Sequence, residues 1–96
     1  MRLSEKARVL FKEIVARKDS QAELYLYGSR VDDALRGGDI DFLIVSERLK
    51  LRDKLDILVQ MKDALGDQKI DILIRTAQES RADPFVREII ESARRL

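Results

Sequence analysis

Three aspartates stand inside apolar segments of the chain, where charged residues are rare. Asp39 and Asp41 are alternate residues at the start of segment 39–46, and Asp71 lies between two isoleucines in segment 69–75. Alternate side chains of a strand share one face, with Cα atoms roughly 6–7 Å apart. Like charges on one face of a buried strand are costly unless a cation lies between them. If the two strands are neighbours, the three carboxylates can converge on a hard cation such as Mg²⁺.

Each aspartate also has a purely structural interpretation. Asp39 could close the turn begun by the preceding glycines, Asp41 could pair with an arginine, and Asp71 could lie at a strand edge. For any one residue alone, the structural interpretation is favoured. For Asp41 and Asp71 together, each flanked by isoleucine or phenylalanine, a functional site is the better hypothesis.

A second candidate is the sequence Tyr27-Gly28-Ser29-Arg30, where a predicted strand meets a predicted short helix. The glycine lets a ligand approach the backbone, and a helix N-terminus offers free N–H groups to an anion. Ser29 can cap the helix and also donate its hydroxyl to a phosphate oxygen. Alone, such a turn is more often only a cap. Followed by Asp39 and Asp41, it predicts a phosphate cradle beside a metal site, as nucleotide transfer from a triphosphate requires.

The elements that would position these residues follow from apolar spacing, caps and breakers. We expect helices over 4–18, 29–35 and 51–65 and from Asp83-Pro84 to the C-terminus, and strands over 23–27, 39–46 and 69–75. The order αβαβαβα predicts a single α/β (α+β) domain over residues 1–96, with a small mixed sheet flanked by helices. The apolar stripe of the third helix is expected to contain Leu51, Leu55, Leu58, Met61 (or Lys62) and Leu65. Arg94 and Arg95 are interpreted as favourable charges at a helix C-terminus.

Composition limits the chemistry further. The 96 residues are 45% apolar and 39% charged with a net charge of +1, which is typical of one globular domain and gives no basic face for nucleic acid or membranes. The absence of cysteine and histidine excludes thiol, zinc-ribbon and imidazole chemistry. No apolar run is long enough for a membrane span or a signal peptide, so we expect a cytoplasmic protein.

These residues together resemble the signature of the polymerase β-like nucleotidyltransferases. Gly28-Ser29, nine further residues, then Asp39-Ile40-Asp41 and an apolar strand are similar to that pattern, and Asp71 matches the third carboxylate of the family. The length is similar to that of the minimal branch, the MNT proteins. The spacing is one residue shorter than in many members, and Gly38 stands where many have a hydroxyl residue.

The resemblance implies a palm-like fold, a function and roles for individual residues. Gly28 and Ser29 would bind the triphosphate of ATP, with Arg30 a weaker candidate for phosphate contact. Asp39 and Asp41 would hold two Mg²⁺ ions, and Asp71 would be the general base or a ligand of the second ion. As in similar MNT proteins, the partner would be a HEPN-domain ribonuclease toxin, and the chain its antitoxin, transferring AMP to a toxin tyrosine.

Two alternatives remain at this stage. The chain could be an inert binding module that neutralises the toxin by occlusion, or a transferase acting on a small molecule such as an aminoglycoside. A domain this small leaves little surface to enclose an acceptor, so the missing wall would come from a partner or from a second copy of the chain. Tyr25 and Tyr27 could stack on a base, but aromatic residues in strands more often pack on the sheet.

Overall fold

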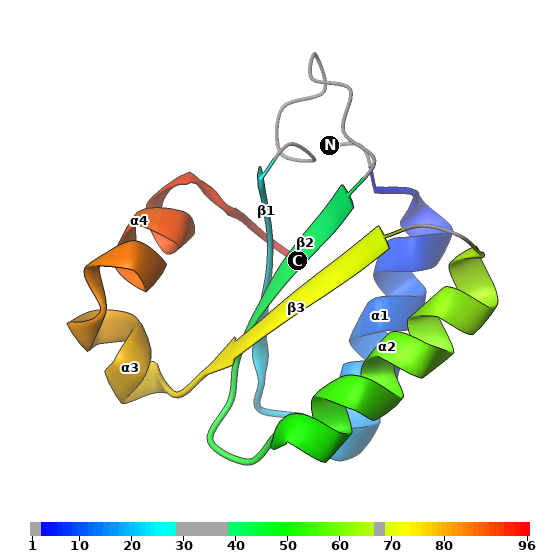
Figure 1. Ribbon diagram of the computed structural model, residues 1–96, viewed down its shortest axis with the longest axis horizontal. Coiled ribbons are helices and arrows are strands. Elements are labelled where there is room, and N and C mark those ends of the chain that lie inside the picture. The colour runs from blue at the N-terminus through cyan, green and yellow to red at the C-terminus, as the bar shows by residue number, and fades with distance from the viewer. Residues whose placement is uncertain (1–2, 29–38, 67–68) are drawn as a thin grey trace.

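The computed structural model describes residues 3–28, 39–66 and 69–96, apart from the side chain of Asp39, and these form a mixed β-sheet between two pairs of helices (Figure 1). The elements run in the order α1 (Glu5–Lys18), β1 (Glu23–Tyr27), β2 (Asp39–Val45), α2 (Leu51–Leu65), β3 (Lys69–Arg75), α3 (Ala77–Ala82), α4 (Pro84–Ser92) and β4 (Arg94–Arg95). The predicted α/β class with a mixed sheet is therefore confirmed. The helix expected over 29–35 and the turn after it lie outside the described residues.

The strands lie in the order β3-β2-β1-β4, so β2 and β1 are central in the described sheet and β3 has a free edge. β2 pairs with β3 in parallel and with β1 antiparallel, and β1 also pairs antiparallel with β4. Helices α1 and α2 lie on one side of the sheet, and α3 and α4 on the other (Figure 1). The topology thus places the starts of β2 and β3 at the same end as the end of β1.

The main core lies between the sheet and the α1–α2 pair. Ile40, Phe42 and Ile44 of β2 point into it and are at most 3% exposed. The rings of Phe11 on α1 and Phe42 stack with centroids 3.7 Å apart. Burying each such side chain contributes about 1.5–3 kcal/mol, so this face supplies most of the apolar stabilisation.

A smaller core lies on the opposite face, under α4. Leu43 and Val45 of β2 pack with Val86 and Ile89 of α4, and Tyr27 is partly buried against the same cluster. Asp41 precedes these residues on the same face of β2, because alternate side chains of a strand share a face. This face is therefore apolar along most of β2 and acidic near its start.

Local sequence signals explain most helix ends. Ser4 caps α1 by accepting a hydrogen bond from the amide of Ala7 at 3.1 Å, and Asp83 caps α4 by accepting one from Phe85 at 2.9 Å. Gly66 follows α2 with φ of 77°, a left-handed conformation that glycine adopts without strain. These ends agree with the sequence-based prediction.

Three features differ from the prediction. Helix α3 was not expected, although Thr76 and Glu79 form a capping box that is visible in the sequence as Thr-x-x-Glu. The interpretation of Arg94 and Arg95 as the end of a helix is wrong. Helix α4 ends at Ser92, and the two arginines pair with β1, where they satisfy backbone groups that a strand edge would otherwise expose.

The third difference is the rotation of α2 about its axis. Its fully buried residues are Ile57 and Met61, whereas the expected core residues Leu51 and Leu55 are 69% and 53% exposed. Lys18 of α1 bridges to Asp53 and Asp56 of α2, which fixes that side of the helix against α1. Leu51 and Leu55, at the start of the predicted stripe, therefore face outward, whereas Met61 is buried as expected and Leu58 and Leu65 pack against the core.

Candidate active site

Tyr27, Asp41 and Asp71 form a row across three neighbouring strands. Tyr27 of β1 is the register partner of Asp41 of β2, and Asp41 is the register partner of Asp71 of β3. Register partners lie on the same face of a sheet, on strands spaced about 4.7–4.9 Å apart. The expectation that the two aspartate-bearing strands are neighbours is confirmed.

Like charges directly opposite one another in a sheet are unfavourable unless a cation compensates them. Asp41 is half-buried and Asp71 is exposed, so both carboxylates border open space beside the small core under α4. Carboxylate oxygens are the donors that Mg²⁺ prefers. The donor chemistry of these two carboxylates therefore fits a hard divalent cation.

Gly28 brings the backbone against this pair of carboxylates. Its φ is +79°, which most side chains adopt only with strain, and a Cβ atom placed on it would lie 2.5 Å from Oδ2 of Asp41. Glycine is thus required at this position both for conformation and for space. The close approach of the turn to Asp41 agrees with a phosphate-binding role for Gly28.

Tyr27 is the residue of this site for which the sequence gave the weakest indication of a functional role. Partial burial raises the pKa of its phenol, and the negative charges of Asp41 and Asp71 raise that pKa further, while Arg75 opposes them. The phenol is therefore protonated at neutral pH and able to donate a hydrogen bond. Tyr27 is the register partner of Asp41, and this pairing across strands left no signal in the sequence.

Tyr25 differs from Tyr27 in its surroundings. Its hydroxyl donates a hydrogen bond to Oε1 of Glu23 at 3.0 Å, and the guanidinium of Arg95 lies 5.6 Å from its ring centroid. These contacts, together with packing against the core under α4, account for Tyr25 as a sheet-face residue. Packing, the favoured interpretation, fits Tyr25 well.

The remaining predicted site residues are placed only in part. The backbone of Asp39 pairs with that of Lys69 in the β2–β3 ladder, but its side chain is not described. Ser29 and Arg30 lie outside the described residues. Within the part of the chain that the structure describes, no three acidic side chains gather as a metal cluster, so the convergence of all three aspartates stays a prediction.

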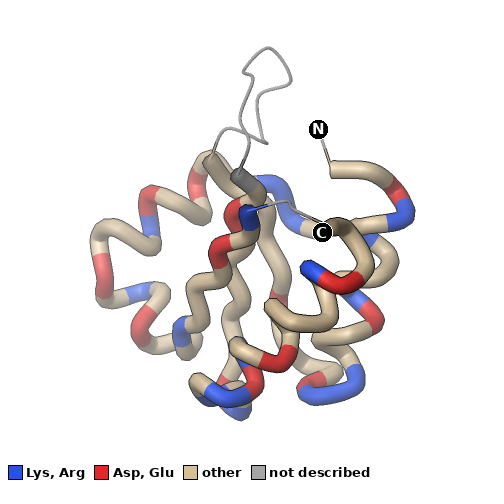
Figure 2. Tube along the Cα trace, turned by 45° about the vertical axis from the view of Figure 1, so that its right-hand side comes forward, with Lys and Arg blue, Asp and Glu red and all other residues tan. Residues whose placement is uncertain are grey.

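Among the described residues outside this row, no cluster of charges of a single sign forms a competing site. Figure 2 shows acidic and basic positions interspersed along the helices. Asp19 is buried, but its Oδ2 accepts a hydrogen bond from Ser46 Oγ at 2.6 Å and its Oδ1 one from the Gln21 amide at 2.9 Å. That carboxylate is satisfied by the amide of its own turn and by Ser46 after β2, which explains it structurally. No helix among the described residues has the length and apolar character needed to cross a membrane.

Comparison with known proteins agrees with this geometry. The family model of the nucleotidyltransferase domain matches residues 9–96. A crystal structure of a protein classed as a nucleotidyltransferase is 34% identical, with a TM-score of 0.63 over 93% of this chain and 96% of the other. A chain of a mutant of the toxin–antitoxin pair MntA–HpeT has the same fold, with a TM-score of 0.64 at 15% identity, over 97% of this chain and 71% of the other. No curated protein matches the chain.

Proposed function

Because the chain belongs to the nucleotidyltransferase domain family, we propose that it transfers AMP from ATP to a hydroxyl group of a partner protein. We take the acceptor to be a tyrosine of a HEPN-domain ribonuclease toxin, for which this chain is the antitoxin. The observation that carries the proposal is the pairing of Asp41 with Asp71 beside the turn at Gly28.

The described geometry supports a division of roles. Asp39 and Asp41 would hold Mg²⁺, which when bound supplies positive charge to the phosphates, and Asp71 would serve as the general base. Gly28, with Ser29 and Arg30, would bind the triphosphate, since a glycine turn without a side chain lets phosphate oxygens reach backbone N–H groups. Tyr27 would donate its hydroxyl hydrogen to a ligand oxygen at the edge of the same row.

The reaction is a displacement at phosphorus. The acceptor oxygen forms a bond to the α-phosphorus of ATP, while the bond from that phosphorus to the oxygen bridging toward the β-phosphate breaks. Pyrophosphate leaves with the bonding electron pair. Asp71 takes the proton of the acceptor hydroxyl, because its exposed carboxylate is the member of the row open to an incoming protein side chain.

Two observations support a toxin partner. The neighbour that shares the fold belongs to a toxin–antitoxin pair. A domain of this size also has little surface of its own to enclose an acceptor, which favours a protein that brings its acceptor with it. ATP and a toxin that attacks RNA place this function in the cytoplasm.

Transfer of label from ATP labelled at the α-phosphate tests the proposal. The wild-type chain, incubated with Mg²⁺ and its purified HEPN-domain toxin partner, is expected to label that protein. Asp41→Asn should lower the rate on the order of 100-fold or more, because it removes a charge that stabilises the transition state. Equal labelling by wild type and variant would contradict the proposal. Protection from the toxin by Asp41→Asn without labelling would identify occlusion instead.

A further inference from the structure

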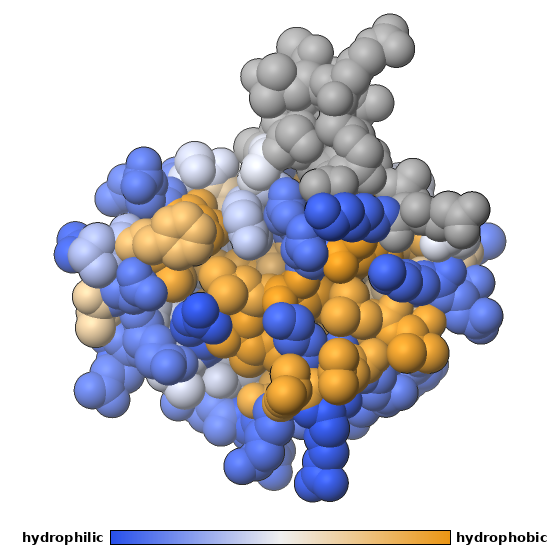
Figure 3. Space-filling model, in the orientation of Figure 1, coloured by the Kyte–Doolittle hydropathy of each residue, from blue (hydrophilic) through white to orange (hydrophobic). Residues whose placement is uncertain are grey.

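The outward face of α2 carries a row of apolar side chains that the fold does not bury. Leu51, Leu55 and Val59 are 69%, 53% and 66% exposed. Residues four apart lie above one another on a helix, so these three form one ridge. Leu58 is half-buried between this ridge and the core. We call these four residues the outer α2 ridge; Figure 3 shows apolar atoms gathered over α2 and the neighbouring β3.

The spacing of the ridge is that of a helix-packing seam. Intervals of four and three residues repeat along α2: Leu51, Leu55, Leu58, Lys62 and Leu65. A repeat of this kind fits the side chains of a second helix laid along it. The core of this chain uses Ile57 and Met61, with Leu58 and Leu65 packed against it, so the fold leaves Leu51, Leu55 and Val59 uncovered. Three large apolar side chains left in one exposed row are typical of an interaction surface.

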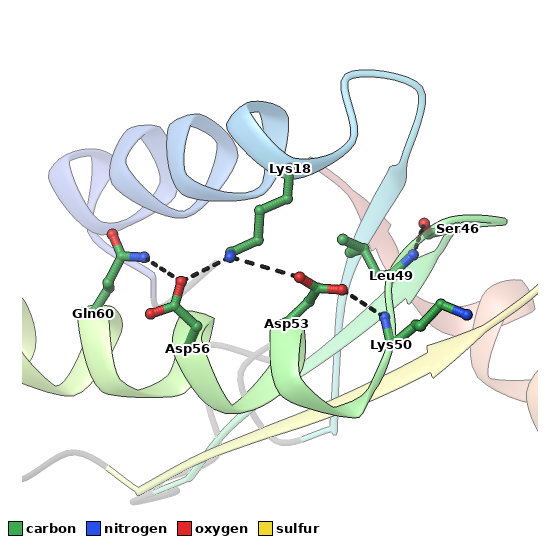
Figure 4. A network of polar contacts seen from close by, with 7 residues as sticks. All are labelled: Lys18, Ser46, Leu49, Lys50, Asp53, Asp56 and Gln60. Carbon is green, nitrogen blue, oxygen red and sulfur yellow. Dashed lines mark hydrogen bonds and ion pairs between the residues drawn. The ribbon is translucent and has the colours of Figure 1, made fainter.

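Charges near the ridge limit what can cover it. On the side of α2 that faces α1, Lys18 Nζ lies 2.7 Å from Asp56 Oδ2 and 3.7 Å from Asp53 Oδ1 (Figure 4). Gln60 donates a further hydrogen bond to Asp56 at 3.2 Å. The negative charges of these two aspartates are thus engaged within the chain.

The cations of α2 are not engaged in this way. Arg52, Lys54 and Lys62 form no ion pair with any described residue, and Asp63 is the one described carboxylate of α2 without such a pair. Lys54 also lines a hollow of about 240 Å³ between the start of α2 and the end of β3. That hollow is bordered by Leu49, Lys50, Leu51, Lys54, Ile74 and Arg75. The apolar ridge therefore has cations on the same helix, and one of them, Lys62, continues its row.

We propose that the outer α2 ridge is the docking surface for the partner protein, which covers it with an amphipathic helix bordered by acidic side chains. Its apolar residues would pack on Leu55 and Val59, and a carboxylate would enter the hollow beside Lys54. The existence of the partner rests on the proposed function. The surface and its chemistry rest on the exposure and charge of α2.

A second copy of the chain is a poorer occupant. A two-fold symmetric contact places a patch against itself, so the cations bordering one ridge would face those of the other. Like charges brought together at an interface are unfavourable, whereas an acidic partner would neutralise them. The Asp41 row lies on the opposite face of the sheet, so the helix that docks on α2 is not the segment of the partner that carries the acceptor tyrosine.

The test measures the affinity of the purified HEPN-domain toxin partner for variants of this chain. Leu55→Glu and Val59→Glu are each expected to weaken binding by roughly 30-fold or more, because each buries a charge at the centre of the contact. Val9→Glu is the matched control, since Val9 is also an exposed apolar helix residue, 42% exposed, but lies on α1. It should bind as wild type. Lys54→Glu should weaken binding and flatten its dependence on salt.

Separate readouts distinguish this inference from the proposed function. Leu55→Glu should keep the melting temperature and the Mg²⁺-dependent ATP binding of wild type while losing the partner, and Asp41→Asn should keep the partner while losing label transfer. Unchanged partner binding by both ridge variants would overturn the inference, as would a wild-type chain that does not bind this protein. So would a wild-type dimer that Leu55→Glu dissociates, because a second copy would then cover the ridge.

Discussion

The two faces of strand β2 are built from alternate residues of one short segment, yet they serve different purposes. Ile40, Phe42 and Ile44 point toward α1 and α2 and are almost fully buried. On the other face, Leu43 and Val45 lie under α4, but Asp41 pairs across the sheet with Asp71 at a place where the cover is incomplete. One face therefore holds the fold together, and the start of the other is open to a ligand.

This difference shows how a domain of 96 residues can accommodate charged groups inside a sheet. The closed face supplies stability that does not depend on the aspartates, so the open end can hold an arrangement that is unfavourable without a cation. Stability and chemistry are divided between odd and even positions of the same strand. Substitutions at neighbouring residues should then have opposite effects: one lowers stability, and the other lowers activity.

The largest effect on stability is expected from the closed face. Phe42→Ala removes a fully buried ring that stacks on Phe11 and should lower the free energy of unfolding by about 3–5 kcal/mol. Asp41→Asn, one residue away, should change it by less than about 1 kcal/mol. Urea unfolding followed by circular dichroism measures both. If Asp41→Asn lowered the free energy of unfolding as much as Phe42→Ala does, the claim that the two faces have different roles would be contradicted.

A second substitution separates backbone strain from contact with the site. Gly28→Ala places a Cβ atom 2.5 Å from Asp41 Oδ2 and should displace that carboxylate, lowering label transfer on the order of 100-fold. Gly66→Ala is the matched control, because Gly66 has a similar φ of +77° with nothing within 4 Å of the added atom. Both variants should lose stability of roughly 1–2 kcal/mol from strain. If Gly66→Ala impaired transfer equally, strain alone would explain both.

The smallest effect concerns the phenol at the end of the row. The pKa of Tyr27 is raised above 10 in the folded chain, by burial and by Asp41 and Asp71, so the folded state holds the proton more tightly than the unfolded state. This contribution to stability is complete below pH 10 and is lost as pH rises through the folded pKa. Tyr27→Phe should therefore lose less stability than wild type as the pH rises above about 10.

Unfolding free energies of wild type and Tyr27→Phe at pH 8 and above pH 10 measure this difference. Tyr25→Phe provides a comparison, because burial also raises the pKa of Tyr25 but its neighbours are Glu23 and Arg95 and not the aspartate row. If the unfolding free energies of wild type and Tyr27→Phe changed in parallel with pH, the aspartate row would not affect the pKa of the phenol.

Much of the fold could be predicted because its signals are local. Ser4 and Asp83 cap their helices through hydrogen bonds to amides two or three residues away, which the sequence indicates directly. The aspartate pair was predicted only conditionally, since strand order depends on contacts between distant segments. The register of Asp41 with Asp71 supplied what the sequence lacked.

The rotation of α2 could not be predicted from its own sequence. The helix carries two apolar stripes, one with Ile57 and Met61 and one with Leu51 and Leu55, and periodicity alone does not say which is buried. The choice follows from tertiary contacts, among them the bridge from Lys18 to Asp56. Strand β4 was missed for a similar reason, because two residues that pair with β1 have no periodicity of their own.

The most direct test of the central claim, that the aspartate row binds a metal-bound nucleotide, is isothermal titration of ATP into the chain with and without Mg²⁺. The wild-type chain is expected to bind ATP only when Mg²⁺ is present. The double variant Asp39→Asn, Asp41→Asn should lose this binding while keeping its melting temperature within a few degrees of wild type. Identical titrations for wild type and the double variant, or binding that is indifferent to Mg²⁺, would contradict the claim.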